Sequence, residues 1–263
     1  MSYRKFRNIG FIVILAVIIL AIIVSSLYKS TQSSSIIGQQ IPNTLYDNLI
    51  SLSQQGYNVT VSPIHLGVLP YNFSSNGKPA VIFVGAEWCP YCAAERWALI
   101  IALLRFGNFT NLEYMLSSST DVYPNTPTFT FVNSTYTSKY IAFVPIEYEN
   151  REHQPLEKVP LNIYDMWTEY GNGSIPFIII GYYYEVGTTI DPGLLAGKNW
   201  SYVISQLNNP NSQIYKEIYA QANLITEYIC KIDGNNPVSV CSHFMDSNQV
   251  ENENVFMITD SKI

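Results

Sequence analysis

Cys89 and Cys92 are the residues of this sequence whose types and spacing suggest chemistry. They lie in the stretch VIFVGAEWCPYCAAERWALI, residues 81–100. Thiol–disulfide exchange needs an exposed thiolate and a second thiol that resolves the mixed disulfide. If Cys89 caps a helix and Pro90 occupies its first position, Cys92 falls on the same face within disulfide reach. We therefore predict a catalytic redox pair in which Cys89 exchanges and Cys92 resolves.

The expected helix explains why the two thiols would differ. Its unpaired N–H groups and the positive end of its dipole favour a thiolate at Cys89 and lower its pKa. Cys92, one turn further along, is expected to be more buried and less reactive. Trp88 would flank the sulfur and offer an apolar surface to polypeptide. Glu95 and Arg96 follow on the same helix, where a solvated ion pair is a simpler expectation than an influence on the thiols.

The pair also has two structural interpretations, an inert disulfide and half of a zinc site. A zinc site would need a second closely spaced pair or nearby histidines. Cys230 and Cys241 are separated by a ten-residue loop, and the three histidines are scattered along the chain: His65, His153 and His243. We therefore predict no metal and no cofactor, and the inert disulfide remains the open alternative.

The four cysteines form an even set, which indicates two disulfides in an oxidising compartment. Proximity in the sequence pairs Cys89 with Cys92 and Cys230 with Cys241, although the sequence does not exclude crossed pairings. A Cys230–Cys241 disulfide would stabilise the fold by roughly 2–3 kcal/mol through loop closure. We predict that it is structural. A second, electron-shuttling pair is the rival interpretation.

The elements around the cysteines predict a mixed α/β fold with helices on both faces of a central sheet. The continuous apolar run at 80–86 is typical of a strand buried on both faces, and the following helix is expected to end at Gly107. A helix after Pro42 would bury three leucines. The remaining expected elements are a strand at 111–119, a hairpin made by 126–133 and 139–149, a helix at 160–171, two strands joined near Gly181, and helices at 199–209 and 211–232.

The N-terminal residues predict a membrane anchor. Residues 9–27 contain no charge and match the length of one membrane-spanning helix, whereas a cleaved signal peptide usually has a shorter apolar run. Arg4, Lys5 and Arg7 precede the run, so residues 1–8 are expected to stay cytoplasmic. The predicted order is then a cytoplasmic tail (1–8), an anchor (9–27), a linker (28–40), a folded domain (41–245) and a polar C-terminal tail (246–263).

The composition agrees with a domain outside the cell. Charged residues make up 13% of the chain, and the net charge of −6 leaves no basic stripe for nucleic acid. Six N-x-S/T sequons would lie in exposed loops or strand edges if a glycosylating pathway exports the chain. They begin at Asn58, Asn72, Asn108, Asn133, Asn172 and Asn199.

The strand, the WCPYC motif and the helix resemble the thioredoxin superfamily, and the Pro90-Tyr91 dipeptide resembles that of glutaredoxins. A second mark is SIPFIII, in which Ile175-Pro176 precedes an apolar strand. The resemblance implies a thioredoxin-like fold, a cis-proline opposite the cysteines, and a peptide-docking edge formed by Ile175 and Pro176 with Trp88. More closely, the membrane-anchored layout and FVGAEWCPYCAAERW resemble an archaeal family catalogued as domain of unknown function 929, which carries no assigned activity.

Two features depart from a minimal thioredoxin domain. Residues 93–175 are more than such a domain needs, so an insertion is expected at about 119–160, beside the active site. No glutathione-binding signature is present. We predict a membrane-anchored extracytoplasmic thiol–disulfide oxidoreductase, an oxidase or isomerase whose partners are exported proteins with thiols or disulfides. The alternative is a non-enzymatic envelope or binding protein with an inert disulfide.

Overall fold

The computed structural model describes residues 13–25, 36–61, 63–245 and 259–262. The chain divides into two units, Met1–Ile37 and Gly38–Ile263. In the first unit, residues 13–25 are helical with exposed side chains, while residues 9–12, 26 and 27 of the predicted anchor lie outside the described residues. Within the described part of the chain, no helix combines the length and apolarity needed to cross a membrane.

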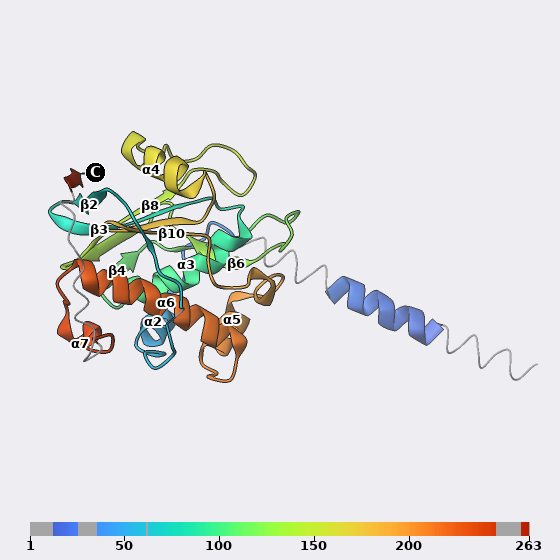
Figure 1. Ribbon diagram of the computed structural model, residues 1–263. Coiled ribbons are helices and arrows are strands. Elements are labelled where there is room, and N and C mark those ends of the chain that lie inside the picture. The colour runs from blue at the N-terminus through green and yellow to red at the C-terminus, as the bar shows by residue number, and fades with distance from the viewer. Residues whose placement is uncertain (1–12, 26–35, 62, 246–258, 263) are drawn as a thin grey trace, which may run out of the picture. The chain divides into compact units, whose positions relative to one another are not determined.

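The strand before the cysteines, β3 (Lys78–Gly85), lies inside the central sheet of the second unit (Figure 1). Its last six residues are buried, as the continuous apolar run predicts for a strand covered on both faces. β3 pairs in parallel with β8 (Ala142–Glu147) and antiparallel with β9 (Phe177–Ile180). The sheet is therefore mixed, and its central strand leads directly to the cysteines.

The sheet continues on both sides of β3. β9 forms an antiparallel hairpin with β10 (Tyr183–Val186), and the turn contains Gly181 with φ +63°. Only glycine adopts this left-handed conformation at little cost. The remaining strands of the seven-stranded sheet are β1 (Gly67–Val68), β2 (Tyr71–Ser75) and β11 (Thr259–Lys262).

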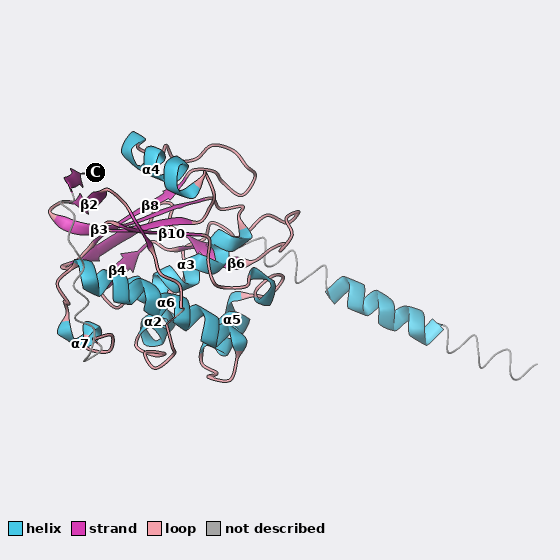
Figure 2. Ribbon diagram, viewed as in Figure 1, coloured by secondary structure: helices cyan, strands magenta, loops and turns pink. Residues whose placement is uncertain are grey.

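Helices cover both faces of the sheet, as predicted (Figure 2). On one face lies α4 (Leu161–Gly171), which buries Ile163, Met166 and Trp167 against apolar side chains of β3 and β9. On the other face lie α3 (Pro90–Leu103) and α6 (Gln213–Ile232), which pack against each other. The other helices are α2 (Asn43–Ser53), η1 (Pro192–Leu194), α5 (Trp200–Leu207) and α7 (Val238–Cys241).

The predicted hairpin between 126–133 and 139–149 is wrong. β6 (Pro127–Thr130) pairs with β5 (Glu113–Leu116), and β7 (Thr135–Ser138) pairs with β4 (Gly107–Thr110). β8 instead joins β3 in the central sheet. Alternating β-forming residues show that a strand exists but do not identify its partner.

The same pairing corrects the predicted insertion at 119–160. β8 lies within that range but is a strand of the seven-stranded sheet, whereas β6 and β7, also within it, belong to the two small sheets. The helix after the cysteines also ends earlier than Gly107, at Leu103, and Gly107 begins β4. There the Cβ of any other residue would lie 2.3 Å from the Thr137 carbonyl oxygen.

Backbone pairing is also found in the segments predicted as linker and as C-terminal tail. Residues assigned to the linker already pair with β5, because the Gly38 N–H donates to the Tyr114 carbonyl and Gln40 forms a bridge with Glu113. Of the predicted polar tail, residues 246–258 and 263 lie outside the described residues. Thr259–Lys262 form β11, which pairs in parallel with β2.

Candidate redox site

Cys89 is the N-cap of α3, and Pro90 occupies the first turn as predicted. Cys89 has an extended backbone (φ −74°, ψ 121°), and its Sγ accepts a hydrogen bond from the Cys92 backbone N–H at 3.1 Å. A capping side chain of this kind satisfies one of the N–H groups that a helix leaves unpaired. Both cysteines are free thiols. The cap therefore places a sulfur at the positive end of the helix dipole.

The surroundings give the two thiols opposite acidities. Burial opposes ionisation of Cys89, but hydrogen bonds from Cys92 and the positive charge of Arg96 outweigh it, so the pKa of the Cys89 thiol is lowered. Burial raises the pKa of Cys92 well above its ordinary value, and the neighbouring Cys89 raises it further. This is the asymmetry expected of a nucleophile and a resolving thiol.

Cys89 is less accessible than the sequence argument assumed. Its exposed fraction is 3%, and that of Cys92 is 0%. The loop between β5 and β6 holds two residues that flank Cys89. The Ser118 N–H donates to the Trp88 carbonyl at 2.8 Å, and Tyr123 lies edge-on against Tyr91, with 5.8 Å between the ring centroids. Of these aromatic residues, Tyr91 is exposed to solvent.

Trp88 forms a half-buried wall beside Cys89. Its Nε1 donates to Glu149 Oε2 at 2.7 Å, and its ring stacks on His153 with 4.6 Å between the centroids. Glu149 and His153 belong to the segment that follows β8, and the Glu87 N–H also donates to the Glu149 carbonyl. The indole is therefore held on both its edge and its face.

The strand register places Pro176 next to the end of β3. Phe177 pairs with Val84, so Pro176 precedes β9 at the edge of the sheet from which the chain enters the Cys89 turn. The Ile175–Pro176 peptide is cis, and the Pro176 carbonyl accepts from the Gly187 N–H at 2.8 Å. Ile175 is half-buried and packs against the core between α4 and the sheet. The structure thus brings the start of β9 and the cysteine turn to one edge.

The expectation that Glu95 and Arg96 form a solvated pair is wrong, because both side chains are fully buried. Arg96 forms a bidentate ion pair with Glu147 of β8, with Nε to Oε1 at 2.8 Å and Nη2 to Oε2 at 2.6 Å. The sequence carried a signal for this burial. Apart from Glu95 and Arg96, the segment YCAAERWALIIALL is almost entirely apolar, which is typical of a helix without a solvent face.

Glu95 belongs to a second buried cluster. The Gln221 amide nitrogen of α6 donates to Glu95 Oε1 at 3.2 Å and to Glu185 Oε2 of β10 at 2.9 Å. Burial raises the pKa of Glu95 well above its ordinary value, and the charge of Glu185 adds to the effect. Burial also raises the pKa of Glu185, to about 7. Two carboxyl groups therefore share one amide donor inside the protein.

Another buried carboxyl group, that of Glu87, lies two residues before Cys89. It accepts a hydrogen bond from Thr130 Oγ1 at 2.6 Å. Burial raises the pKa of this carboxyl group, and the nearby charge of Glu147 raises it further. The turn before α3 thus contains an acid that burial holds toward its neutral form.

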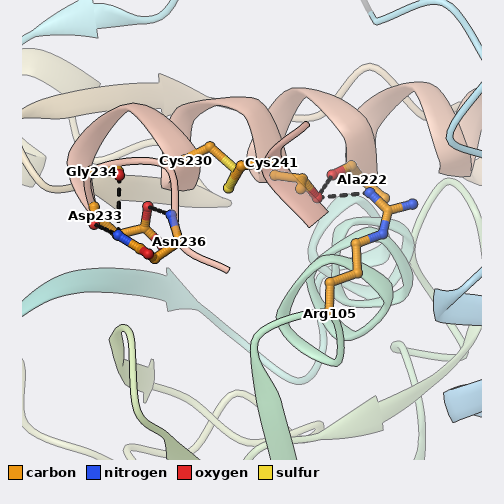
Figure 3. The surroundings of a disulfide bond; sticks show 8 residues. Arg105, Ala222, Cys230, Asp233, Gly234, Asn236 and Cys241 are labelled. Atoms are coloured by element: carbon orange, nitrogen blue, oxygen red, sulfur yellow. Dashed lines mark hydrogen bonds between the residues drawn. A yellow bond between two sulfur atoms is a disulfide. The ribbon is translucent and has the colours of Figure 1, made fainter. Parts of the chain in front are cut away.

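Cys230 and Cys241 form a disulfide between α6 and α7, with 5.6 Å between their Cα atoms (Figure 3). α6 bonds to the N-terminal half of α3 through Gln221–Glu95, and to Arg105, just past the C-terminus of α3, through Thr226. Cys230 follows Thr226 by one turn. The disulfide therefore lies toward the C-terminal end of α3, whereas Cys89 lies at its N-terminus.

The described residues contain no group of three or more histidine, cysteine or carboxylate side chains placed to hold a metal ion. A family model described as a domain of unknown function, DUF929, matches residues 65–231 of the chain. This range includes the cysteine turn, Pro176 and both buried carboxylate clusters. Neither the curated proteins nor the solved structures contain a match to this chain.

Proposed function

The chain belongs to the DUF929 family, and within this family we propose that it is a thiol–disulfide oxidoreductase that uses Cys89 and Cys92. One observation carries the proposal. A thiol whose pKa is lowered caps a helix and accepts a hydrogen bond from the residue that bears the second thiol. A disulfide with a purely structural role requires neither the cap nor the difference in acidity.

The exchange follows from these two acidities. In the oxidising direction, a substrate thiolate attacks Sγ of Cys89 in the Cys89–Cys92 disulfide, and Cys92 leaves as a thiolate that takes up a proton. A second substrate thiolate then attacks the substrate sulfur of the mixed disulfide, and Cys89 leaves. The substrate loses two electrons and two protons, and the cysteine pair gains them. In isomerisation, the reduced Cys89 attacks and is later displaced, so no net oxidant is needed.

The arrangement of the strands supports a thioredoxin-like fold. Four neighbouring strands follow the order β10, β9, β3 and β8, with β8 parallel to β3 and β9 antiparallel to both β3 and β10. In chain order, the strands β4 to β7 come between α3 and β8, and α4 comes between β8 and β9. In such a fold the start of β9, at Ile175 and Pro176, would form the edge along which an extended peptide docks, with Trp88 beside it.

We place the proposed activity of the folded domain on the extracytoplasmic side of the cell membrane. The uncharged stretch at 9–27 and the basic residues before it support a single anchor with a cytoplasmic N-terminus. Exported proteins with thiols or disulfides are then the substrates. The position of the Cys230–Cys241 disulfide, toward the other end of α3 from Cys89, supports a structural role for it rather than a shuttle.

A single-turnover experiment tests the proposal without an added oxidant. The full-length protein, oxidised and then freed of reagent, is mixed with an equimolar dithiol peptide that reports disulfide formation by fluorescence. We expect about one peptide disulfide for each Cys89–Cys92 disulfide consumed, and none from the Cys89→Ala variant. A protein that remains oxidised while the peptide remains reduced would show an inert disulfide, which is the property of the alternative, a non-enzymatic binding protein.

A further inference from the structure

Arg96 lies one helical turn after Cys92 on α3 and is fully buried. Its guanidinium group bonds to Glu147, and Nη2 also donates to the Ala86 carbonyl at 2.8 Å. Its Cζ lies 5.4 Å from the centre of the Phe83 ring. Within the described structure, Nη1 is buried without a hydrogen-bond partner. The group is thus fixed in place while part of its donor capacity is unused.

The second buried arginine near this helix, Arg105, offers a comparison. Arg105, just past the C-terminus of α3, uses all three side-chain nitrogens as donors, and its partners are Ser53, Gln55, Asn223 and Thr226. None of these partners is charged. Arg96, in contrast, places a buried cation with an unused donor near the cysteines, and a buried ion pair is weak evidence of a stabilising role.

The Ala86 peptide connects Arg96 with both cysteines. Its carbonyl accepts from Arg96 Nη2 and, at 3.3 Å, from the Cys89 N–H. Its N–H forms a hydrogen bond that lowers the pKa of the Cys92 thiol. The positive charge of Arg96 also lowers the pKa of each of the two thiols. One guanidinium group therefore orients the backbone of the turn and acts on both sulfur atoms.

Among the groups that act on the pKa values of the two thiols, Arg96 is the cation, and His153, which stacks on Trp88, is not one of these groups. Burial raises the pKa of the Glu87 carboxyl group, which favours its neutral form. Burial and the charges of Glu149 and the two cysteines raise the pKa of Tyr148 to about 12, so this phenol stays neutral near pH 7. Glu149 is a carboxylate partner of Trp88 and would oppose a thiolate. Arg96 is thus the cation available to the thiols among these neighbours.

We propose that Arg96 is the positioning residue of the redox pair, a buried cation that stabilises the negative charge that exchange places in turn on the sulfur atoms of Cys92 and Cys89. The inference rests on the proposed thiol–disulfide function and deepens it. Glu147 holds the guanidinium group in place, and β8 is therefore part of the site although it contributes no reacting atom.

The test measures how fast iodoacetamide alkylates Cys89 as a function of pH in full-length protein carrying Cys92→Ala, so that one thiol of the pair titrates. The charge is removed together with its partner, as Arg96→Met/Glu147→Leu, because a lone buried carboxylate would endanger folding. We expect the rate at pH 6 to fall roughly tenfold, since the loss of a nearby opposite charge moves a pKa by about one unit. Arg96→Lys should retain most of the rate.

Arg105→Lys is the matched control, because it alters a buried arginine beside the same helix without touching the cysteine turn. Its alkylation profile should equal that of the parent. If the double variant folds, by circular dichroism, and keeps the parent profile, Arg96 only joins α3 to β8 and the proposal is wrong. If that variant does not fold, Arg96→Gln/Glu147→Gln, which retains hydrogen-bonding groups, is measured instead. An alkylation profile equal to that of the parent would again show that the proposal is wrong. The single-turnover experiment tests the redox function separately, because the oxidised wild type would transfer no disulfide if that function were absent.

Discussion

The Trp88 indole N–H donates a hydrogen bond to Glu149 Oε2, 2.7 Å away, and so ties the wall of the cysteine turn to the segment after β8. Aromatic side chains held in a fixed orientation lose little entropy when a partner binds, which is one reason that they dominate many binding surfaces. Trp88 is therefore well placed to contact a polypeptide that approaches Cys89.

Replacing Trp88 with alanine is expected to weaken substrate binding more than chemistry. The KM for a dithiol peptide should rise roughly 5–30-fold, the range typical of losing an aromatic contact. The pH profile of Cys89 alkylation should keep its midpoint, because Trp88 supplies no charge to the sulfur. Steady-state kinetics of Trp88→Ala and Trp88→Phe measure this. A lower kcat at unchanged KM would contradict a role in binding.

The two thiols should differ sharply in reactivity. In a Cys92→Ala variant, Cys89 should still be alkylated below pH 8, because the backbone N–H of residue 92 and the charge of Arg96, which both lower its pKa, are retained. In a Cys89→Ala variant, the fully buried Cys92 should react far more slowly, because burial raises its pKa. Mass spectrometry after timed alkylation of the two folded variants gives the rates. Equal rates would remove the distinction between nucleophile and resolving thiol.

Stability should fall as pH rises, through the carboxyl groups that share Gln221. Burial raises the pKa of Glu185 from 4.5 to about 7, so the folded protein binds this proton more tightly than the unfolded chain does. The contribution is complete below pH 4.5 and is lost as pH rises to 7, with a size on the order of 3 kcal/mol. Urea unfolding at pH 5 and pH 8 measures the difference.

Glu185→Gln should remove the part of that pH difference that comes from Glu185, because the amide stays neutral and still accepts the Gln221 hydrogen bond, while buried Glu95 keeps its own part. The exposed Glu152→Gln variant is the control and should keep the wild-type difference. The outcome that contradicts this prediction is a wild-type protein that loses no more stability between pH 5 and pH 8 than the Glu185→Gln variant does. Glu185 would then hold no proton more tightly in the folded protein than in the unfolded chain.

Removing the second disulfide should affect stability and leave exchange intact. Cys230→Ala/Cys241→Ala opens a loop of sequence separation 11, and we expect the free energy of unfolding to fall by roughly 2–3 kcal/mol. The rate of single-turnover disulfide transfer should be unchanged within twofold. A large drop in that rate in a folded double variant would favour the shuttle interpretation.

The local elements of this fold could be predicted from the sequence. The cap at Cys89, the helix carrying Leu45, Leu49 and Leu52, and the end of α4 at Gly171 follow from turn residues and apolar spacing. These signals act over one or two turns of chain. They needed no knowledge of distant partners.

The pairing of β8 and the partners of the buried charges could not be predicted in this way. β8 looks like the second half of a hairpin, but its β-forming residues fit either neighbour, and only the whole sheet selects β3. Arg96 could have been recognised as buried from its apolar helix. Its partner Glu147 lies 51 residues away, a distance at which sequence periodicity carries no information.

The distance in sequence between β3 and its partner strands also affects folding during synthesis. The cysteines, the cap and α3 leave the ribosome early, but the flanking strands β8 and β9 end only at Glu147 and Ile180. Contacts between such distant segments carry a large loop-closure cost and form late in folding. While the growing chain is shorter than 180 residues, Cys89 and Cys92 therefore have no complete sheet to enclose them and are open to pairing with a cysteine of another protein.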